Sequence, residues 1–375
     1  MKRKLRVLVV LFNLAVVNGV SSFVMNYFRK LNHSIVQMDF VVYSKVESPY
    51  VNEIQNAGGK IYLIPSIRKI SQHIAASKKI IEEGHYDIVH DNILILSYFI
   101  MHYAKKYGVP VRIFHSHNSK FGDVKYKEIR NRLFMPLLFS TITDYFSCSE
   151  LAAQNIFGKR PYTFIPNVIS PARFSFNEEK RKKIRRAFAI GNKLVIGSVG
   201  RLAEQKNPLY AIDVISELYK INPNIEYWWI GEGYLQPQVE NKIHEKGMDG
   251  VIKLLGRRTD MADLYQALDI FFLPSLFEGL PVTGVEAQAT GLPCLISDTI
   301  TKQFIYTDLV KTFPIKNSPK RVAEILAQYK RTIHFDRDRS KYVKILESTQ
   351  FSDKHAGQYL LAVYKKLLDR QYNIK

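Results

Sequence analysis

The sequence predicts an α/β protein made of two Rossmann-like domains, each built on a parallel sheet. Short apolar runs alternate with longer amphipathic stretches along nearly the whole chain, as expected for strands buried on both faces and the helices that cover them. The alternation occurs twice, and a segment rich in lysine and arginine separates the two series. The chain has 375 residues, which is enough for two domains of ordinary size. We therefore expect two parallel sheets that face each other across a cleft.

The first domain is expected to span residues 1–175. Its first apolar stretch, from Leu5 to Phe28, follows MKRK, so a signal peptide or a membrane span is an alternative interpretation. Asn13, Asn18 and Gly19 would then have to lie in hydrocarbon, which favours a buried strand followed by a loop and a helix. The candidate strands are Leu5–Phe12, Val36–Tyr43, Lys60–Ile64, Asp87–His90, Val111–His115, Tyr145–Cys148 and Tyr162–Ile165.

A basic connector, residues 176–192, is expected to lead into a second domain over residues 193–350. The candidate strands of that domain are Leu194–Val199, Ile225–Ile230, Val251–Leu255, Ile270–Leu273, Pro293–Ile296 and Val310–Phe313. Residues 351–375 contain Leu360, Tyr364 and Leu367 at helical spacing. We expect this C-terminal helix to pack back on the first domain.

The net charge of +20 is concentrated in the first half of the chain. Residues 1–170 hold 22 Lys and Arg against 11 Asp and Glu, and residues 171–193 hold 8 against 2. This asymmetry indicates a polyanionic partner, with anionic lipid headgroups, a lipid diphosphate or nucleic acid as candidates, while a solvated face without a partner is the alternative. No nucleic-acid-binding signature is present, so we expect no nucleic acid partner. Cys148 and Cys294 lie in apolar runs, which predicts buried thiols in a reducing cytoplasm.

The most informative segment is PSLFEGLPVTGVEAQATGLPC, residues 274–294. Gly279 and Pro281 place Glu278 in a turn before a helix that contains Glu286. The amides of Gly279, Leu280 and Val282 would be free to bind an anion such as a diphosphate, and Glu286 could accept hydrogen bonds from ribose hydroxyls. Glu278 could hold hydroxyls of a sugar. The alternative is that both acids are ordinary charges near a helix N-terminus.

A second segment, GSVGRLAEQKN at residues 197–207, carries Arg201 and Lys206 in a loop after the first strand of the second domain. Two cations there could neutralise a leaving diphosphate, which in other enzymes is the task of a metal ion. The alternative is two solvated loop cations. No Asp-x-Asp or His/Asp cluster with convincing metal spacing accompanies these two segments, so we expect neither a metal nor another cofactor.

Together these segments resemble the family 4 retaining glycosyltransferases of the GT-B fold, of the type found in capsule and exopolysaccharide synthesis. The Glu278–Glu286 spacing followed by Gly291, Leu292 and Pro293 resembles one family motif, and Gly200, Arg201, Leu202 and Lys206 resemble another. The resemblance implies that Arg201 and Lys206 bind the donor diphosphate, Glu286 binds the ribose, and Glu278 with the following amides binds sugar and phosphates. Gly231 and Arg257 lie in turns that resemble family segments near the nucleotide.

The resemblance also implies a histidine in the first domain that contacts the transferred sugar. Both His115 and His117 are candidates; spacing does not decide between them, and we slightly prefer His117. Gly19 lies in a loop that partly resembles the family's glycine-rich loop, although the usual second glycine is missing. Val168 stands where the family has a glycine after Ile165-Pro166-Asn167.

Residues 120–139 combine cations with a large apolar stretch, which suits a segment at a membrane surface. The alternative is a core helix with solvated cations. The expected function is transfer of a hexose or N-acetylhexosamine from a nucleotide sugar, UDP-linked by preference, to a polyprenyl-diphosphate-linked saccharide at the inner face of the cell membrane. A nucleotide-sugar 2-epimerase of the same fold is the alternative. The cations of the expected acceptor or membrane surface are Lys120, Lys125, Lys127, Arg130 and Arg132.

Overall fold

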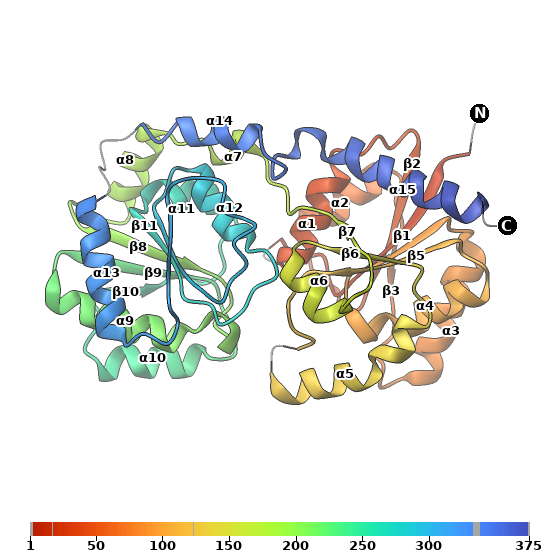
Figure 1. Cartoon of the computed structure of the whole chain (residues 1–375), viewed down its shortest axis with the longest axis horizontal. Coiled ribbons are helices and arrows are strands. Elements are labelled where there is room, and N and C mark those ends of the chain that lie inside the picture. Colours follow the sequence, from red (N-terminus) through yellow and green to blue (C-terminus); the bar gives the residue numbers. More distant parts are fainter. Residues whose placement is uncertain (1–2, 17, 123, 333–337, 374–375) are drawn as a thin grey trace. The chain divides into compact units, whose positions relative to one another are not determined.

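The computed structural model describes residues 3–16, 18–122, 124–332 and 338–373, and it divides into two compact units. Unit 1 comprises Met1–Val168 and Asp353–Lys375, and unit 2 comprises Ile169–Ser352. Each unit contains one parallel sheet with helices on its faces (Figure 1). The predicted fold class, two Rossmann-like parallel sheets in an α/β protein, is confirmed.

Unit 1 has a seven-stranded sheet in the order β3-β2-β1-β4-β5-β6-β7, in which every neighbouring pair is parallel. The order reverses direction between β1 and β4, which is where such sheets usually bind ligands. The strands are β1 (Leu5–Leu11), β2 (Val36–Val42), β3 (Ile61–Leu63), β4 (Ile88–Asp91), β5 (Val111–Ser116), β6 (Asp144–Ser147) and β7 (Thr163–Phe164). The helices are α1 (Gly19–Phe28), α2 (Pro49–Asn56), α3 (Ile70–Gly84), η1 (Leu94–Ser97), α4 (Tyr98–Lys106), α5 (Lys125–Phe139), α6 (Glu150–Phe157), η3 (Asp353–His355) and α15 (Ala356–Asn373).

The C-terminal helix α15 packs on unit 1 beside α1, as predicted (Figure 1). Gly357 allows a very close approach, since a Cβ atom there would lie 1.9 Å from the carbonyl oxygen of Lys30. Ion pairs join Lys30 to Asp353 at 3.0 Å, and Arg370 to Asp144. The apolar face of α15 completes the core cluster that contains the first strand. The last helix of the chain is therefore an integral part of the first unit.

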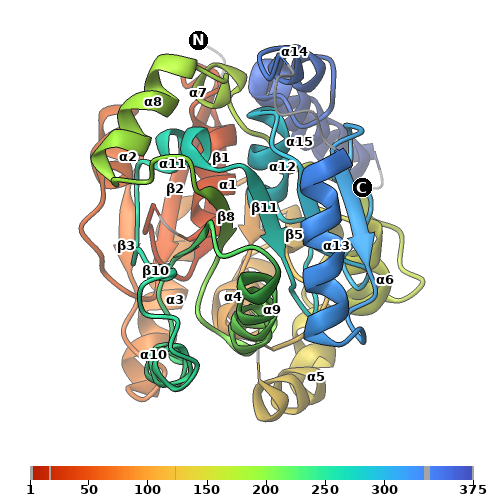
Figure 2. The same cartoon turned by 90° about the vertical axis from the view of Figure 1, so that its left-hand side faces the viewer.

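Unit 2 repeats the plan with a six-stranded parallel sheet in the order β10-β9-β8-β11-β12-β13. Helices α9 and α13 lie side by side over one face of this sheet (Figures 1 and 2). The strands are β8 (Leu194–Val199), β9 (Ile225–Ile230), β10 (Ile252–Leu254), β11 (Ile270–Leu273), β12 (Cys294–Ser297) and β13 (Val310–Phe313). The helices are α7 (Pro171–Phe174), α8 (Glu178–Ala187), η2 (Glu204–Lys206), α9 (Pro208–Ile221), α10 (Gln236–Glu245), α11 (Met261–Ala267), α12 (Val282–Ala289), α13 (Pro319–Thr332) and α14 (Lys341–Glu347).

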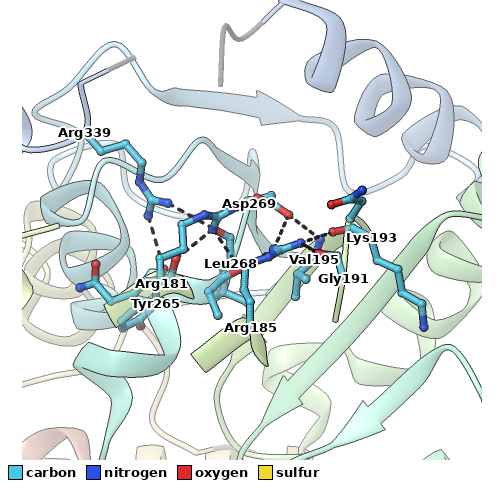
Figure 3. Close-up of polar contacts among 12 residues, drawn as sticks. Arg181, Arg185, Gly191, Lys193, Val195, Tyr265, Leu268, Asp269 and Arg339 are labelled. Atoms are coloured by element: carbon cyan, nitrogen blue, oxygen red, sulfur yellow. Dashed lines mark hydrogen bonds and ion pairs between the residues drawn. The ribbon is translucent and has the colours of Figure 1, made fainter. Parts of the chain in front are cut away.

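The basic segment expected to connect the domains lies inside unit 2, where α8 packs against α11. Asp269, which is buried just before β11, accepts hydrogen bonds from Arg181, Arg185 and the backbone N–H of Val195 (Figure 3). The two arginines also donate to backbone carbonyls at the end of α11, including that of Ala267. A buried carboxylate is tolerated when it is paired in this way. These two cations therefore hold α8 in place rather than facing an external polyanion.

The N-terminal apolar stretch forms strand β1 and helix α1, in agreement with the predicted strand. None of the helices in the described ranges combines the length and the apolar character that a membrane crossing requires. Cys148 and Cys294 are free and buried, as their apolar surroundings in the sequence predicted.

Candidate active site

Three glycines shape the turns that follow β8, β9 and β10 in unit 2. The N–H of Gly231 donates to the carbonyl of Gly256 at 2.8 Å, and the N–H of Gly200 donates to Ile230 at 3.0 Å. Gly231 has φ +139°, and a Cβ atom there would lie 2.2 Å from the carbonyl oxygen of Gly200. Only glycine fits this position, because both the backbone conformation and the space exclude a side chain. The close approach fixes the loop that carries Arg201.

Lys206 and Glu278 form an ion pair beside this turn. The lysine is the last residue of η2, and its Nζ lies 2.5 Å from Oε1 of Glu278. Its aliphatic chain lies over Gly200, where a Cβ atom would come within 2.8 Å of the lysine Cε. Gln205 donates to Oε2 of Glu278 at 3.3 Å, and Glu278 is only 6% exposed. Lys206 was expected to bind the diphosphate of a donor and Glu278 to bind its sugar, and in the structure these two side chains contact each other.

Glu286 lies on α12 and is held by Tyr265 from α11. The tyrosine hydroxyl donates to Oε2 of Glu286 at 3.0 Å and lies 3.3 Å from the carbonyl oxygen of Thr283. Burial raises the pKa of Glu286 to about 7, although the bond from Tyr265 and the charge of Arg173 act in the opposite direction. The ionisation of this carboxyl is therefore poised near neutral pH.

Helix α12 begins immediately after the turn that contains Glu278. Its N-cap is Pro281, which offers no side-chain cap, and Val282 is the first helical residue. Gly279 and Leu280 are buried in the preceding turn. The first-turn amides of a helix have no acceptor within the helix, and the helix dipole favours an anion beside them. This local geometry agrees with the turn and helix expected from the sequence.

The other two predicted cations of unit 2 are more exposed. Arg201 is exposed, and its Nη2 lies 3.4 Å from Oε1 of Gln205. Arg257 follows Gly256 and pairs with Glu232 at 2.9 Å between Nε and Oε2. Because Glu232 lies in the turn after β9, this pair links the two turns that the sequence placed near the nucleotide.

In unit 1 the predicted loop residue Gly19 is the first residue of α1, and it is exposed. The side chain of Asn18 caps the helix by accepting from Val20 N at 2.9 Å and Ser21 N at 3.3 Å. Apart from its chain neighbours and the backbone of its own helix, no described atom lies within 4 Å of the position that a Cβ on Gly19 would take. Gly19 is therefore an exposed position with open space in the first turn of a capped helix, not a loop residue as predicted.

The two candidate histidines differ in accessibility. His115 lies in β5, one residue before its end, and is 1% exposed, whereas His117 follows β5, is half-buried and donates from Nε2 to Oδ1 of Asn92 at 2.8 Å. The two rings stack with their centroids 4.0 Å apart. Burial lowers the pKa of His117 to about 3, so its ring is neutral at physiological pH. His117 is thus the histidine whose surface can meet a ligand.

Helix α5 divides the apolar residues of segment 120–139 between core and surface. Phe121, Met135 and Leu138 are buried, which fits the core alternative for these positions. One outer face is apolar nevertheless, with Leu133 at 72% exposure. The predicted cations Lys120, Lys125, Arg130 and Arg132 are exposed and Lys127 is half-buried. The large apolar side chains exposed on this face are Tyr126, Ile129, Leu133, Phe134 and Leu137.

Sequence reasoning missed Gln205, Tyr265, His90 and Asn92, which contact the predicted residues. Asn92 could have been found, since it follows a strand that neighbours β1 at the reversal of strand order. Tyr265 carried no local signal. Within the described residues, no group of three or more His, Cys, Asp or Glu could hold a metal ion.

The two parallel-sheet units have the GT-B fold. A solved structure of HepE from Anabaena, in complex with UDP and glucose, shares this fold, with a TM-score of 0.76 over 96% of this chain and 100% of that one at 14% identity. The family described as glycosyl transferases group 1 matches residues 180–345.

Two curated relatives extend the similarity along the chain. The putative glycosyltransferase EpsF of Bacillus subtilis (strain 168) is 32% identical over 298 residues, which cover 76% of this chain and 77% of EpsF. An Escherichia coli enzyme named UDP-Gal:alpha-D-GlcNAc-diphosphoundecaprenol alpha-1,3-galactosyltransferase is 26% identical over 278 residues, with 70% and 72% coverage. The chain belongs to the group 1 glycosyltransferase family.

Proposed function

We propose that this glycosyltransferase transfers a hexose or N-acetylhexosamine, with retention and without a metal ion, from a UDP-linked sugar to a polyprenyl-diphosphate-linked saccharide. The reaction belongs to surface polysaccharide synthesis. The observation that carries the proposal is the arrangement of Lys206 and Glu278 beside the uncapped start of α12, with Glu286 further along that helix. This set combines a cation, free amides and hydroxyl acceptors, which together suit a nucleotide sugar.

Each group has a role in the proposed donor complex. Lys206 and Arg201 neutralise the diphosphate, and the first amides of α12 donate to its oxygens. Glu286 accepts hydrogen bonds from the ribose, and Glu278 accepts them from the sugar. His117 contacts the transferred sugar through its ring. Because two fixed cations stabilise the leaving diphosphate, the transfer step has no need of a metal ion.

The acceptor class is supported by one relative and by the surface of unit 1. The name of the Escherichia coli relative specifies a UDP-linked galactose donor and a diphosphoundecaprenol-linked acceptor. The apolar face of α5, centred on Leu133, is bordered by Lys125 and Arg130. A helix with an exposed apolar face and flanking cations binds an anionic bilayer surface. We infer that α5 brings the enzyme to the membrane that holds its acceptor.

Donor binding is tested by calorimetry and thermal unfolding with UDP, GDP, ADP and CMP in the presence of EDTA. UDP at a hundredfold excess over Kd should stabilise the protein by about 2.7 kcal/mol. Glu286→Gln should abolish most of this effect, whereas Glu240→Gln on the exposed surface of unit 2 should not. Stabilisation by GDP alone would overturn the UDP assignment. A loss of binding in EDTA would overturn metal independence.

Membrane binding is tested by sedimentation with phosphatidylcholine vesicles that do or do not contain phosphatidylglycerol. Leu133→Glu places a carboxylate on the apolar face of α5 and should reduce binding to the anionic vesicles. Ile221→Glu is the matched control, because Ile221 is also exposed but lies on α9 of unit 2. Equal binding by the two variants would exclude α5 as the contact surface.

A further inference from the structure

Three histidine rings form a continuous stack inside unit 1, with His117 at its exposed end. His90, on β4, contacts His115 with 3.1 Å between Nε2 and Nδ1, and these rings are nearly parallel at 13°. His115 in turn stacks on His117 with centroids 4.0 Å apart. His90 and His115 are 3% and 1% exposed, so the stack runs from the core toward the surface.

The buried end of the stack is bonded to the C-terminal helix. The hydroxyl of Tyr364, on α15, lies 2.7 Å from Nδ1 of His90. Tyr364 is fully buried, and burial raises its pKa, so it is a neutral hydroxyl at physiological pH. The neighbouring residues Leu360 and Leu367 already pack α15 on unit 1 through apolar contacts. A phenylalanine would therefore have sufficed for packing alone.

The Tyr364–His90 and His90–His115 contacts fix tautomers because each needs one donor and one acceptor, and His115 then contacts His117 through ring stacking. A neutral imidazole carries a single N–H, so the direction of the Tyr364 bond determines which nitrogen of His90 is protonated. That choice in turn determines the tautomer of His115, whose Nδ1 faces His90 Nε2. Burial lowers the pKa of both buried histidines, and to about 3 for His90, so neither escapes this constraint by becoming charged.

His117 is held from several sides at the other end. Asn92 donates from Nδ2 to the carbonyls of Val10 and His90, so its Oδ1 faces Nε2 of His117 and requires an N–H there. The ring of Phe23 contacts both His115 and His117 edge-on, with its centroid 4.9 Å from that of His115 and 4.7 Å from that of His117. Nδ1 of His117 is left as a hydrogen-bond acceptor, the atom type that a sugar hydroxyl requires.

We propose that Tyr364 is a positioning residue for glycosyl transfer, acting on His117 through His90 and His115. This inference rests on the proposed function, in which His117 contacts the transferred sugar. Helix α15 thereby influences the sugar site through Tyr364, although the three histidines belong to β4, to β5 and to the residue after β5. A purely structural role for the buried bond predicts a change in stability and nothing else.

The test compares Tyr364→Phe with Tyr27→Phe in the full-length enzyme. Tyr27 is a matched control, since its buried hydroxyl also makes a 2.7 Å bond in unit 1, but to the carbonyl of Pro166. Ring ¹⁵N shifts from NMR report the tautomer of each histidine. We expect Tyr364→Phe, and not Tyr27→Phe, to change the tautomers of His90 and His115, and to move the His117 shifts through its stacking on His115 while Asn92 keeps the His117 tautomer.

Activity is measured in parallel as UDP release from the UDP-sugar that the wild type turns over. We expect Tyr364→Phe to lower kcat about tenfold, because small misplacements of a contact group have effects of this order. UDP affinity should stay constant, because Glu286 and Lys206 lie in unit 2. Shift changes that stop at His90, or a kcat equal to that of Tyr27→Phe, would overturn the inference. A wild type that turns over no UDP-sugar would instead refute the proposed function, and the shifts would still decide the coupling.

Discussion

The hydroxyl of Tyr265 should determine the pH range in which the enzyme binds a nucleotide. Tyr265→Phe removes the 3.0 Å bond to Glu286 and leaves the ring in place. The bond favours the ionised carboxylate, which the proposed function requires as acceptor for the ribose hydroxyls. Its loss should raise the pKa of Glu286 above the present value of about 7. Nucleotide binding should then be weaker at neutral pH and recover in more alkaline solution.

The size of the effect follows from the strength of such a bond. A hydrogen bond to a charged group contributes about 1.5–3 kcal/mol, and one pKa unit corresponds to about 1.4 kcal/mol, so the pKa should rise by about one to two units. At pH 7 the ionised fraction would fall from about one half to about 1–10%, and UDP affinity would fall about 5- to 50-fold. At a pH above the new pKa the two proteins should bind UDP equally.

The assay is isothermal calorimetry of UDP across the pH range that includes both pKa values. Tyr227→Phe is the matched control, because Tyr227 is also buried in unit 2 and bonds to the neutral hydroxyl of Ser198 at 2.6 Å. The control should keep the wild-type midpoint. If Tyr265→Phe also keeps the wild-type pH midpoint of UDP binding, the tyrosine does not influence Glu286. If UDP affinity of the wild type does not depend on pH, Glu286 is not the ribose acceptor.

Three further predictions concern stability and are measured by urea unfolding. Asp269→Asn should destabilise unit 2 by about 3–5 kcal/mol, since it leaves two half-buried arginines without the buried carboxylate that pairs with them, and a loss below about 1 kcal/mol would contradict this. Gly231→Ala should cost at least about 1–3 kcal/mol and weaken UDP binding, whereas Gly250→Ala, which has open space, should do neither. The free energy of unfolding of the wild type should exceed that of His90→Asn by an amount that shrinks as pH falls below about 6.5, by about 1.4 kcal/mol per pH unit. The reason is that His90 stays neutral in the folded protein but binds a proton in the unfolded chain, which favours unfolding of the wild type. A difference that does not change with pH would refute this.

The sheets were predictable because both faces of each are covered. A parallel strand buried on two sides must be apolar along its whole length, and the runs at Leu194–Val199, Ile225–Ile230 and Ile270–Leu273 form strands with the predicted bounds. Strand β13 also has the predicted bounds, and elsewhere the ends differ by a single residue, as in β1, which ends at Leu11. End positions depend on the turns, and hydrophobic periodicity does not report on these.

The partners of the charged and polar side chains were less predictable. Arg181 and Arg185 counted toward the charge that was expected to meet a polyanionic partner, because their actual partner, Asp269, lies more than eighty residues along the chain. Tyr364 is 274 residues from His90 in the sequence. Such pairs arise only when separate elements pack, and neither composition nor spacing near one partner identifies the other. The motif identified Glu278, but nothing in the sequence indicated that Glu278 forms an ion pair with Lys206.

That ion pair affects how a donor would bind. Lys206 is paired with Glu278, which is buried and has little access to water. A diphosphate that binds the lysine removes the ion pair from Glu278 and leaves its hydrogen bond from Gln205, and a buried carboxylate without its cation is costly. A sugar attached to the diphosphate can donate hydrogen bonds from its hydroxyls to Glu278, and these bonds offset the loss of the ion pair with Lys206. On the proposed function, the pair therefore favours the intact nucleotide sugar over the free nucleoside diphosphate, and product release re-forms the Lys206–Glu278 contact.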